Sequence, residues 1–154
     1  MNYLTREELK VFMSKLRRNL KDKELLKCLD FILSRLYIVY NSESHCIDRV
    51  NFKISYFQKK CNISNREKAL KTIKNVISFL ESATIHQEWE NGEYIDFRDS
   101  AIIEGVCYTY SYKGEIKNIR ISFAKLEKED MKGQINFRSP VHLLIWGELK
   151  NMDM

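Results

Sequence analysis

The spacing of apolar residues changes near residue 82, and this change constrains the fold more than any other feature. Over residues 65–81 apolar side chains recur three or four positions apart, as on one side of a helix, at Leu70, Ile73, Val76, Ile77 and Leu80. From residue 83 onward they alternate with polar residues, as in strands with one buried face. The sequence therefore predicts an α+β fold in which helices precede an antiparallel sheet.

Two further helices and a short strand are predicted before residue 55. Thr5 and Glu8 have the spacing of a capping box, in which a hydroxyl and a carboxylate satisfy free amides at a helix start. Apolar residues at helical spacing extend this helix to about residue 18, and a second apolar stripe covers residues 25–39. Weak alternation over residues 50–54 predicts the strand.

A short helix, a turn and a longer helix are predicted next, which together make a helix-turn-helix. Ser55 can cap the short helix, and Asn62 can adopt the left-handed backbone that ends it. The spacing of Ser64 and Glu67 predicts a capping box for the longer helix, residues 65–81.

Two dipeptides that end in glycine, Asn91-Gly92 and Lys113-Gly114, predict two β-hairpins, because glycine accepts the positive φ of a tight turn. The hairpin at Asn91-Gly92 directly follows the longer helix and is expected to form a wing. The flanking strands are expected at residues 83–89, 93–97, 101–112 and 115–123. Short helices are expected at residues 124–131 and 140–149.

Length and composition favour one ordered domain over residues 1–154. Hydrophobic residues make up 44% of the chain and charged residues 31%, with a single proline, which is the profile of a globular protein. We expect a winged-helix-like α+β domain. Its parts are N-terminal helices at residues 5–40, a helix-turn-helix with a wing sheet at residues 50–123, and C-terminal helices at residues 124–154.

The sequence contains no sign of a membrane segment, a metal site or a cofactor motif. No apolar run approaches the roughly 20 residues that cross a bilayer, and the start of the chain is too charged for a signal peptide, so we expect a cytoplasmic protein. Cys28, Cys46, Cys61 and Cys107 show no Cys-x-x-Cys spacing, which disfavours a disulfide scaffold or a zinc ribbon. His45-Cys46 with Cys61 lacks an evident fourth ligand, so no metal and no other cofactor is expected.

Positive charge is concentrated in the first half of the chain. Residues 1–80 hold 17 Lys/Arg and 8 Asp/Glu, whereas residues 81–154 hold 9 and 13. A basic half attracts a polyanion, although solvated helix faces with no partner have the same composition.

The polar side of the helix over residues 65–81 holds residue types that bind nucleic acid. Lysine and arginine neutralise phosphates, and arginine and asparagine also hydrogen-bond base edges in a major groove wide enough for a helix. The early residues of such a helix make base contacts, so these are expected from Asn65, Arg66, Lys68 and Thr72. Phosphate contacts are expected from Lys59, Lys60, Lys71 and Lys74, with Asn75 on the same polar side. The predicted partner is double-stranded DNA.

Four segments, residues 52–63, 69–76, 94–97 and 118–126, follow one another in an order that resembles a known family. They are similar to the N-terminal winged-helix domain of plasmid replication initiator proteins, over most of residues 5–130. Asn62-Ile63 stand where that family usually has a glycine, and a second winged helix, which binds the origin repeats, does not fit within these residues. The resemblance implies a role in replication of a plasmid or phage, and dimerisation through the sheet.

Two other functions stay open. The basic surface could belong to a protein–protein interaction module, such as a phage or plasmid inhibitor that covers a host protein. Asp99, Glu115 and Lys117 have the spacing of a metal-dependent nuclease, in which carboxylates hold Mg²⁺ and a lysine positions water. Because charged residues are common at hairpin ends and no nucleophile motif or glycine-rich phosphate loop is present, we expect no enzymatic activity.

Aromatic residues on the predicted strands and the apolar C-terminal segment are two further candidates for contacts with a partner. The aromatic side chains on the predicted strands are expected to pack in the core rather than stack on single-stranded bases, and they are Trp89, Tyr94, Tyr108, Tyr110 and Tyr112. Residues 141–146 are apolar on nearly all sides, so this segment either docks in the core or contacts a partner. A homodimer through the sheet or the C-terminal segment is therefore possible.

Overall fold

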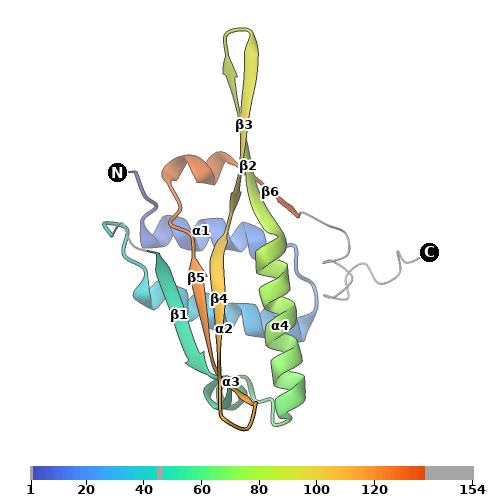
Figure 1. Ribbon diagram of the computed structural model, residues 1–154. Helices are drawn as coiled ribbons and strands as arrows, with labels where there is room; N and C mark the ends of the chain where they lie inside the picture. Colours follow the sequence, from blue (N-terminus) through green and yellow to red (C-terminus); the bar gives the residue numbers. More distant parts are fainter. Residues whose placement is uncertain (1, 45–46, 138–154) are drawn as a thin grey trace, which may run out of the picture.

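Residues 2–44 and 47–137 are described by a computed structural model, drawn as a ribbon in Figure 1. Its elements in chain order are α1 (Arg6–Arg17), α2 (Lys23–Val39), β1 (Asp48–Lys53), α3 (Ile54–Cys61), α4 (Arg66–Ser82), β2 (Ala83–Asn91), β3 (Tyr94–Ala101), β4 (Ile103–Tyr110), β5 (Ile116–Phe123), the 3-10 helix η1 (Lys128–Lys132) and β6 (Gln134–Phe137). Helices combined with antiparallel sheets confirm the predicted α+β class. The predicted helix at residues 140–149, the apolar segment 141–146, His45 and Cys46 lie outside the described residues.

The predicted capping box at the start of α1 is present. Thr5 Oγ1 accepts a hydrogen bond from the Glu8 amide at 3.2 Å, and Glu8 Oε1 accepts one from the Thr5 amide at 2.9 Å. Asp22 caps α2 by accepting from the amides of Glu24 and Leu25. Each cap satisfies amides that have no partner inside the helix, and so fixes where the helix begins.

The short helix, the turn and the longer helix are present, but both predicted caps are wrong. Lys53 occupies the N-cap position of α3 without a side-chain hydrogen bond, so Ser55 lies within the first turn. Asn65 caps α4, and its side chain accepts from the amide three residues further on at 2.9 Å. The helix therefore begins one residue later than a Ser64–Glu67 box requires. Asn62 adopts the left-handed backbone predicted for the turn, with φ 55° and ψ 48°.

The strands form two three-stranded sheets, ordered β1-β5-β4 and β3-β2-β6. In the first sheet β1 pairs with β5 so that Val50 lies opposite Ile121 and Phe52 opposite Ile119, which gives one face buried apolar side chains. In the second sheet β2 pairs with β3 along nearly its whole length, but with β6 only over residues 83–86. Beyond that point β2 and β3 project from the body as a two-stranded ribbon, here called the arm (residues 88–97; Figure 1).

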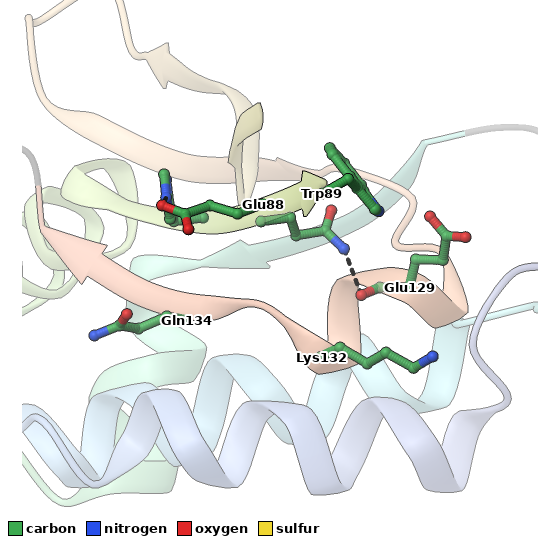
Figure 2. A pocket seen from close by; sticks show the side chains of 7 residues that line it. Glu88, Trp89, Glu129, Lys132 and Gln134 are labelled. Carbon is green, nitrogen blue, oxygen red and sulfur yellow. Dashed lines mark hydrogen bonds and ion pairs between the residues drawn. The ribbon is translucent and has the colours of Figure 1, made fainter. Parts of the chain in front are cut away.

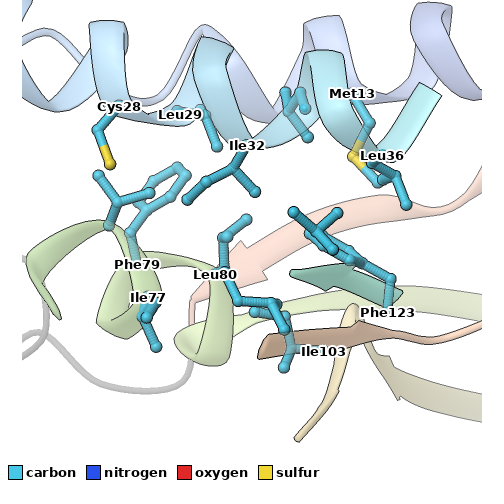
Figure 3. Close-up of a cluster of buried hydrophobic side chains, with 14 of the residues drawn as sticks. Met13, Cys28, Leu29, Ile32, Leu36, Ile77, Phe79, Leu80, Ile103 and Phe123 are labelled. Carbon is cyan, nitrogen blue, oxygen red and sulfur yellow. The ribbon is translucent and has the colours of Figure 1, made fainter. Parts of the chain in front are cut away.

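The core lies between the helices and the apolar face of the first sheet. Leu29 and Ile32 of α2 face Phe79 and Leu80 of α4, with Phe123 of β5 close by (Figure 3). All five side chains are buried. The apolar side predicted for α4 is therefore the side that packs inward.

The hairpins differ in detail from the prediction. The turn between β2 and β3 consists of Gly92, with φ 65°, and Glu93, so Asn91 ends the strand instead of entering the turn. The strand predicted over residues 101–112 is interrupted, because the buried Ile102 separates β3 from β4. In the turn between β4 and β5, Gly114 has the predicted positive φ, 83°.

The prediction of a helix at residues 124–131 is largely wrong, because among these residues only those of η1, which begins at Lys128, are helical. The Ala124 amide donates to the Ile102 carbonyl at 2.9 Å, and the Leu126 carbonyl accepts from the Leu4 amide at 3.1 Å. Neighbouring segments therefore satisfy this backbone in an extended form. Strand β6 was not predicted, because its four residues are too few for a clear alternation.

Gly133, between η1 and β6, has no room for a side chain. A Cβ there would lie 2.5 Å from Ile85 Cγ2 and 3.0 Å from the His86 carbonyl oxygen, and Ile85 is fully buried. We expect Gly133→Ala to lower the free energy of unfolding by about 1–3 kcal/mol, measured by urea denaturation. Gly105→Ala is the matched control, because nothing lies within 4 Å of its Cβ position. Equal destabilisation of both variants would contradict the packing explanation.

Candidate nucleic-acid interface

The exposed side of α4 is basic. Lys68, Lys71 and Lys74 are exposed at helical spacing, and the half-buried Asn75 lies beside them. The ion pairs found among residues 2–44 and 47–137 lie on other elements, and none includes a lysine of α4. Unpaired ammonium groups along one side of a helix suit nucleic-acid phosphates, because each phosphate contact releases condensed counterions.

Three residues predicted for base contacts have structural roles. The prediction that Thr72 contacts bases is wrong, because its side chain is only 6% exposed and its hydroxyl donates to the Lys68 carbonyl at 2.9 Å. Arg66 is half-buried and donates to the carbonyl of Ile116, at the start of β5. Asn65 uses its side-chain oxygen to cap α4, which leaves its NH₂ group for other partners.

Lys59 and Lys60 lie in the last turn of α3, and both are exposed. The Lys60 ammonium lies 5.8 Å from the centre of the Tyr56 ring. Cations in a last helical turn also interact favourably with the negative end of the helix dipole. These lysines therefore have a local stabilising role in addition to the phosphate contacts predicted for them.

A basic hollow of about 330 Å³ lies beside the start of α4, and no sequence motif indicates it. Lys53 ends β1, Ser55 begins α3, Arg66 begins α4, and Lys117 and Asn118 belong to β5. Lys53 and Arg66 supply cations and Ser55 a hydroxyl, which are donors that bind phosphate oxygens, whereas Lys117 pairs with Glu115 and the Asn118 amide donates to Asn51. The pairing of β1 with β5 sets Lys53 opposite Asn118, and the bond from Arg66 to the Ile116 carbonyl brings the start of α4 to them.

The turn between β4 and β5 lies at the same end of the molecule (Figure 1). Ser111 Oγ accepts hydrogen bonds from two amides of the turn, each at 3.3 Å, and so fixes its shape. Tyr112 is fully accessible at the turn, and Lys113 beside it is exposed. The bond from Arg66 to the first carbonyl of β5 joins this hairpin to the start of α4.

The arm lies at the other end. Because α4 continues directly into β2, the Asn91-Gly92 hairpin emerges where α4 ends (Figure 1). The hairpin expected to form a wing therefore lies at the end of α4, and the β4–β5 hairpin lies beside the start of α4. The expected core packing of strand aromatics is wrong for most of them. Tyr108 packs against the core, but the other four side chains are exposed: Trp89, Tyr94, Tyr110 and Tyr112.

A second hollow, of about 520 Å³, lies at the base of the arm between β2, η1 and β6 (Figure 2). Its walls carry Glu88 and Glu129 as well as Lys132, so the charges there are mixed. His86 lies at its edge, with Nε2 3.0 Å from Glu88 Oε1 and Nδ1 2.7 Å from Asp99 Oδ1. Hydrogen bonds to Glu88 and then Asp99 raise the pKa of His86 above 6.5.

The carboxylates of the nuclease hypothesis do not come together. Asp99 bonds to His86 at the base of the arm, whereas Glu115 lies beyond the far end of β4, 3.0 Å from Lys117 Nζ. That ammonium lowers the pKa of Glu115. Within the described ranges, no group of three or more His, Cys, Asp or Glu side chains could hold a metal ion.

Comparisons with known proteins do not identify a relative: no family model, curated protein or solved structure matches this chain. Among the helices of residues 2–44 and 47–137, none combines the length and apolar character needed to cross a membrane. The functional argument therefore rests on the geometry of the two ends of the molecule.

The contacts of His86 predict a pH-dependent contribution to stability. Because its folded-state pKa is raised, protonated His86 stabilises the folded state fully below about pH 6.5, and this stabilisation is lost as the pH rises through the raised pKa. We expect the free energy of unfolding, measured in urea, to fall as the pH rises above about 6.5, and to fall less in His86→Gln. As a control, Asp99→Asn should lower the pKa of His86 measured by NMR. A parallel pH dependence in the unchanged chain and His86→Gln would rule out this role.

Proposed function

We propose that this chain is a winged-helix protein that binds double-stranded DNA, with the first half of α4 in the major groove. One observation carries the proposal. The start of α4 and the β4–β5 turn lie at one end of the molecule (Figure 1), where Lys68 and Lys71 are exposed and Arg66 and Lys117 line the basic hollow, although these residues come from separate parts of the chain.

The order of the elements supports a winged-helix assignment. α2, α3 and α4 form a three-helix unit, in which the left-handed Asn62 sets α3 against α4. β1 lies between α2 and α3 in the sequence and pairs with the second strand of the β4–β5 hairpin. In proteins with a helix-turn-helix the second helix enters the major groove, so α4 is the recognition helix in this proposal. The arm is then an insertion between α4 and β4.

Each part of the basic end has a role in this proposal. The start of α4 enters a groove about 12 Å wide, where the NH₂ group of Asn65 and the ammonium of Lys68 meet base edges. Lys71 contacts a flanking phosphate, and the hollow beside Lys53 receives another. Lys113, at the β4–β5 turn, extends the contact along the backbone of the duplex.

The biological role that we propose is replication of a plasmid or a related mobile element in the cytoplasm. It rests on the order of residue types in residues 52–63, 69–76, 94–97 and 118–126, which resembles the N-terminal domain of plasmid replication initiators, although no family model matches the chain.

A salt titration tests DNA binding. A fluorescently labelled duplex of about 30 base pairs is mixed with the chain, and affinity is measured by anisotropy as salt rises. The slope of log affinity against log salt should shrink by about 1 for each lysine removed in Lys71→Ala/Lys74→Ala, because each of these lysines displaces counterions from a phosphate.

The matched control is Lys128→Ala/Lys132→Ala, which removes the same charge from η1, away from the basic end. Its slope should equal that of the unchanged chain. An equal loss in both double variants would mean that net charge alone drives binding, which contradicts the assigned interface. Absence of duplex binding at low salt rejects the DNA-binding function.

A further inference from the structure

The arm has an exposed surface that DNA binding does not use. Every residue of the arm is exposed. It contains four carboxylates and no basic residue, in a chain whose net charge is +5. The four carboxylates belong to Glu88, Glu90, Glu93 and Asp96.

One face of the arm combines these charges with apolar side chains. Pairing of β2 with β3 sets Ile95 opposite Glu90 and Phe97 opposite Glu88, so the four side chains share a face. Ile95 and Phe97 are each 67% exposed, and Asp99 continues the face toward the body. An apolar pair left in water on a projecting ribbon gains free energy when a partner covers it.

The outer edge of β3 is free as well. β3 is the outer strand of its sheet, and within the described part of the chain it pairs with β2 alone. Backbone amides and carbonyls along such an edge accept an added strand. A hairpin of two strands is marginally stable by itself, so a third strand also stabilises the ribbon.

We propose that the arm binds an extended segment of a partner protein, in which basic residues alternate with apolar residues. The segment adds to the edge of β3 through main-chain hydrogen bonds. Its apolar side chains cover Ile95 and Phe97, and its cations lie on the opposite face of the ribbon, beside Asp96 of β3. Alternation is required because side chains of a strand point to opposite faces in turn.

The charge of the arm distinguishes this partner from two others. Nucleic-acid phosphates are repelled by these four carboxylates, of which Glu88 pairs with His86 at the base of the arm. A second copy of the arm brings four more carboxylates and no cation, and like charges on neighbouring strands are destabilising. A basic segment is the partner whose charge is complementary.

The position of the arm allows both ends of the molecule to be occupied together. The arm and the start of α4, whose Arg66 lines the basic hollow, lie at opposite ends (Figure 1), so a segment bound to β3 does not cover the start of α4. The inference goes beyond the proposed DNA binding and does not depend on it.

The experiment uses the full chain without DNA and a fluorescent probe peptide of four Lys-Val repeats. Binding is measured by anisotropy at low salt. We expect the peptide to bind, and Ile95→Ser/Phe97→Ser to weaken its affinity at least tenfold. A Glu-Val peptide of equal length should not bind, and a Lys-Val peptide with N-methylated valines should bind at least tenfold more weakly, because it cannot form the strand hydrogen bonds.

The matched control is Val11→Ser/Ile38→Ser, which removes two other exposed apolar side chains, on α1 and α2, and should leave peptide affinity unchanged. Thermal unfolding and duplex binding check that the arm variant is folded. Three results would overturn the proposal: no Lys-Val binding, equal binding of the N-methylated peptide, or self-association of the chain in sedimentation that Ile95→Ser/Phe97→Ser abolishes. The last result would make a second copy the partner.

Discussion

Burial of the apolar side of α4 determines how the rest of the molecule is arranged. Phe79 and Leu80 are fully buried against α2 and the sheet, and this contact fixes the rotation of α4 about its axis. The lysines of α4 then face solvent, because they lie on the side of the helix opposite its buried apolar residues. The direction of α4 has a second effect, since its end leads into the arm and its start, through Arg66, bonds to β5. Two ends with different chemistry follow from the placement of one helix.

Local sequence patterns predicted the features whose causes lie within a few residues. The capping box of Thr5 and Glu8, the left-handed turn at Asn62 and the positive φ of Gly114 each depend on neighbouring backbone alone, and each is present. The α+β class was also predictable, because the period of the apolar pattern changes where α4 becomes β2.

The features that sequence did not predict depend on distant partners. Residues 124–126 are extended because Ile102 and Leu4 form hydrogen bonds with their backbone groups. The residues of that segment alone do not predict these hydrogen bonds. Thr72 is polar, yet it lies on the buried side of α4. The basic hollow could not be predicted for the same reason, because Lys53 and Asn118 are neighbours through strand pairing and not in the sequence. In each instance the deciding contact joins residues far apart in the chain.

The free edge of β3 has a consequence for solubility. An accessible strand edge beside Ile95 and Phe97 is a template on which copies of a protein can stack into aggregates, and natural proteins protect such edges with charge. Glu88, Glu90, Glu93 and Asp96 supply that protection here. The colloidal behaviour of the chain therefore depends on the charge of a few exposed side chains that contribute little to its core.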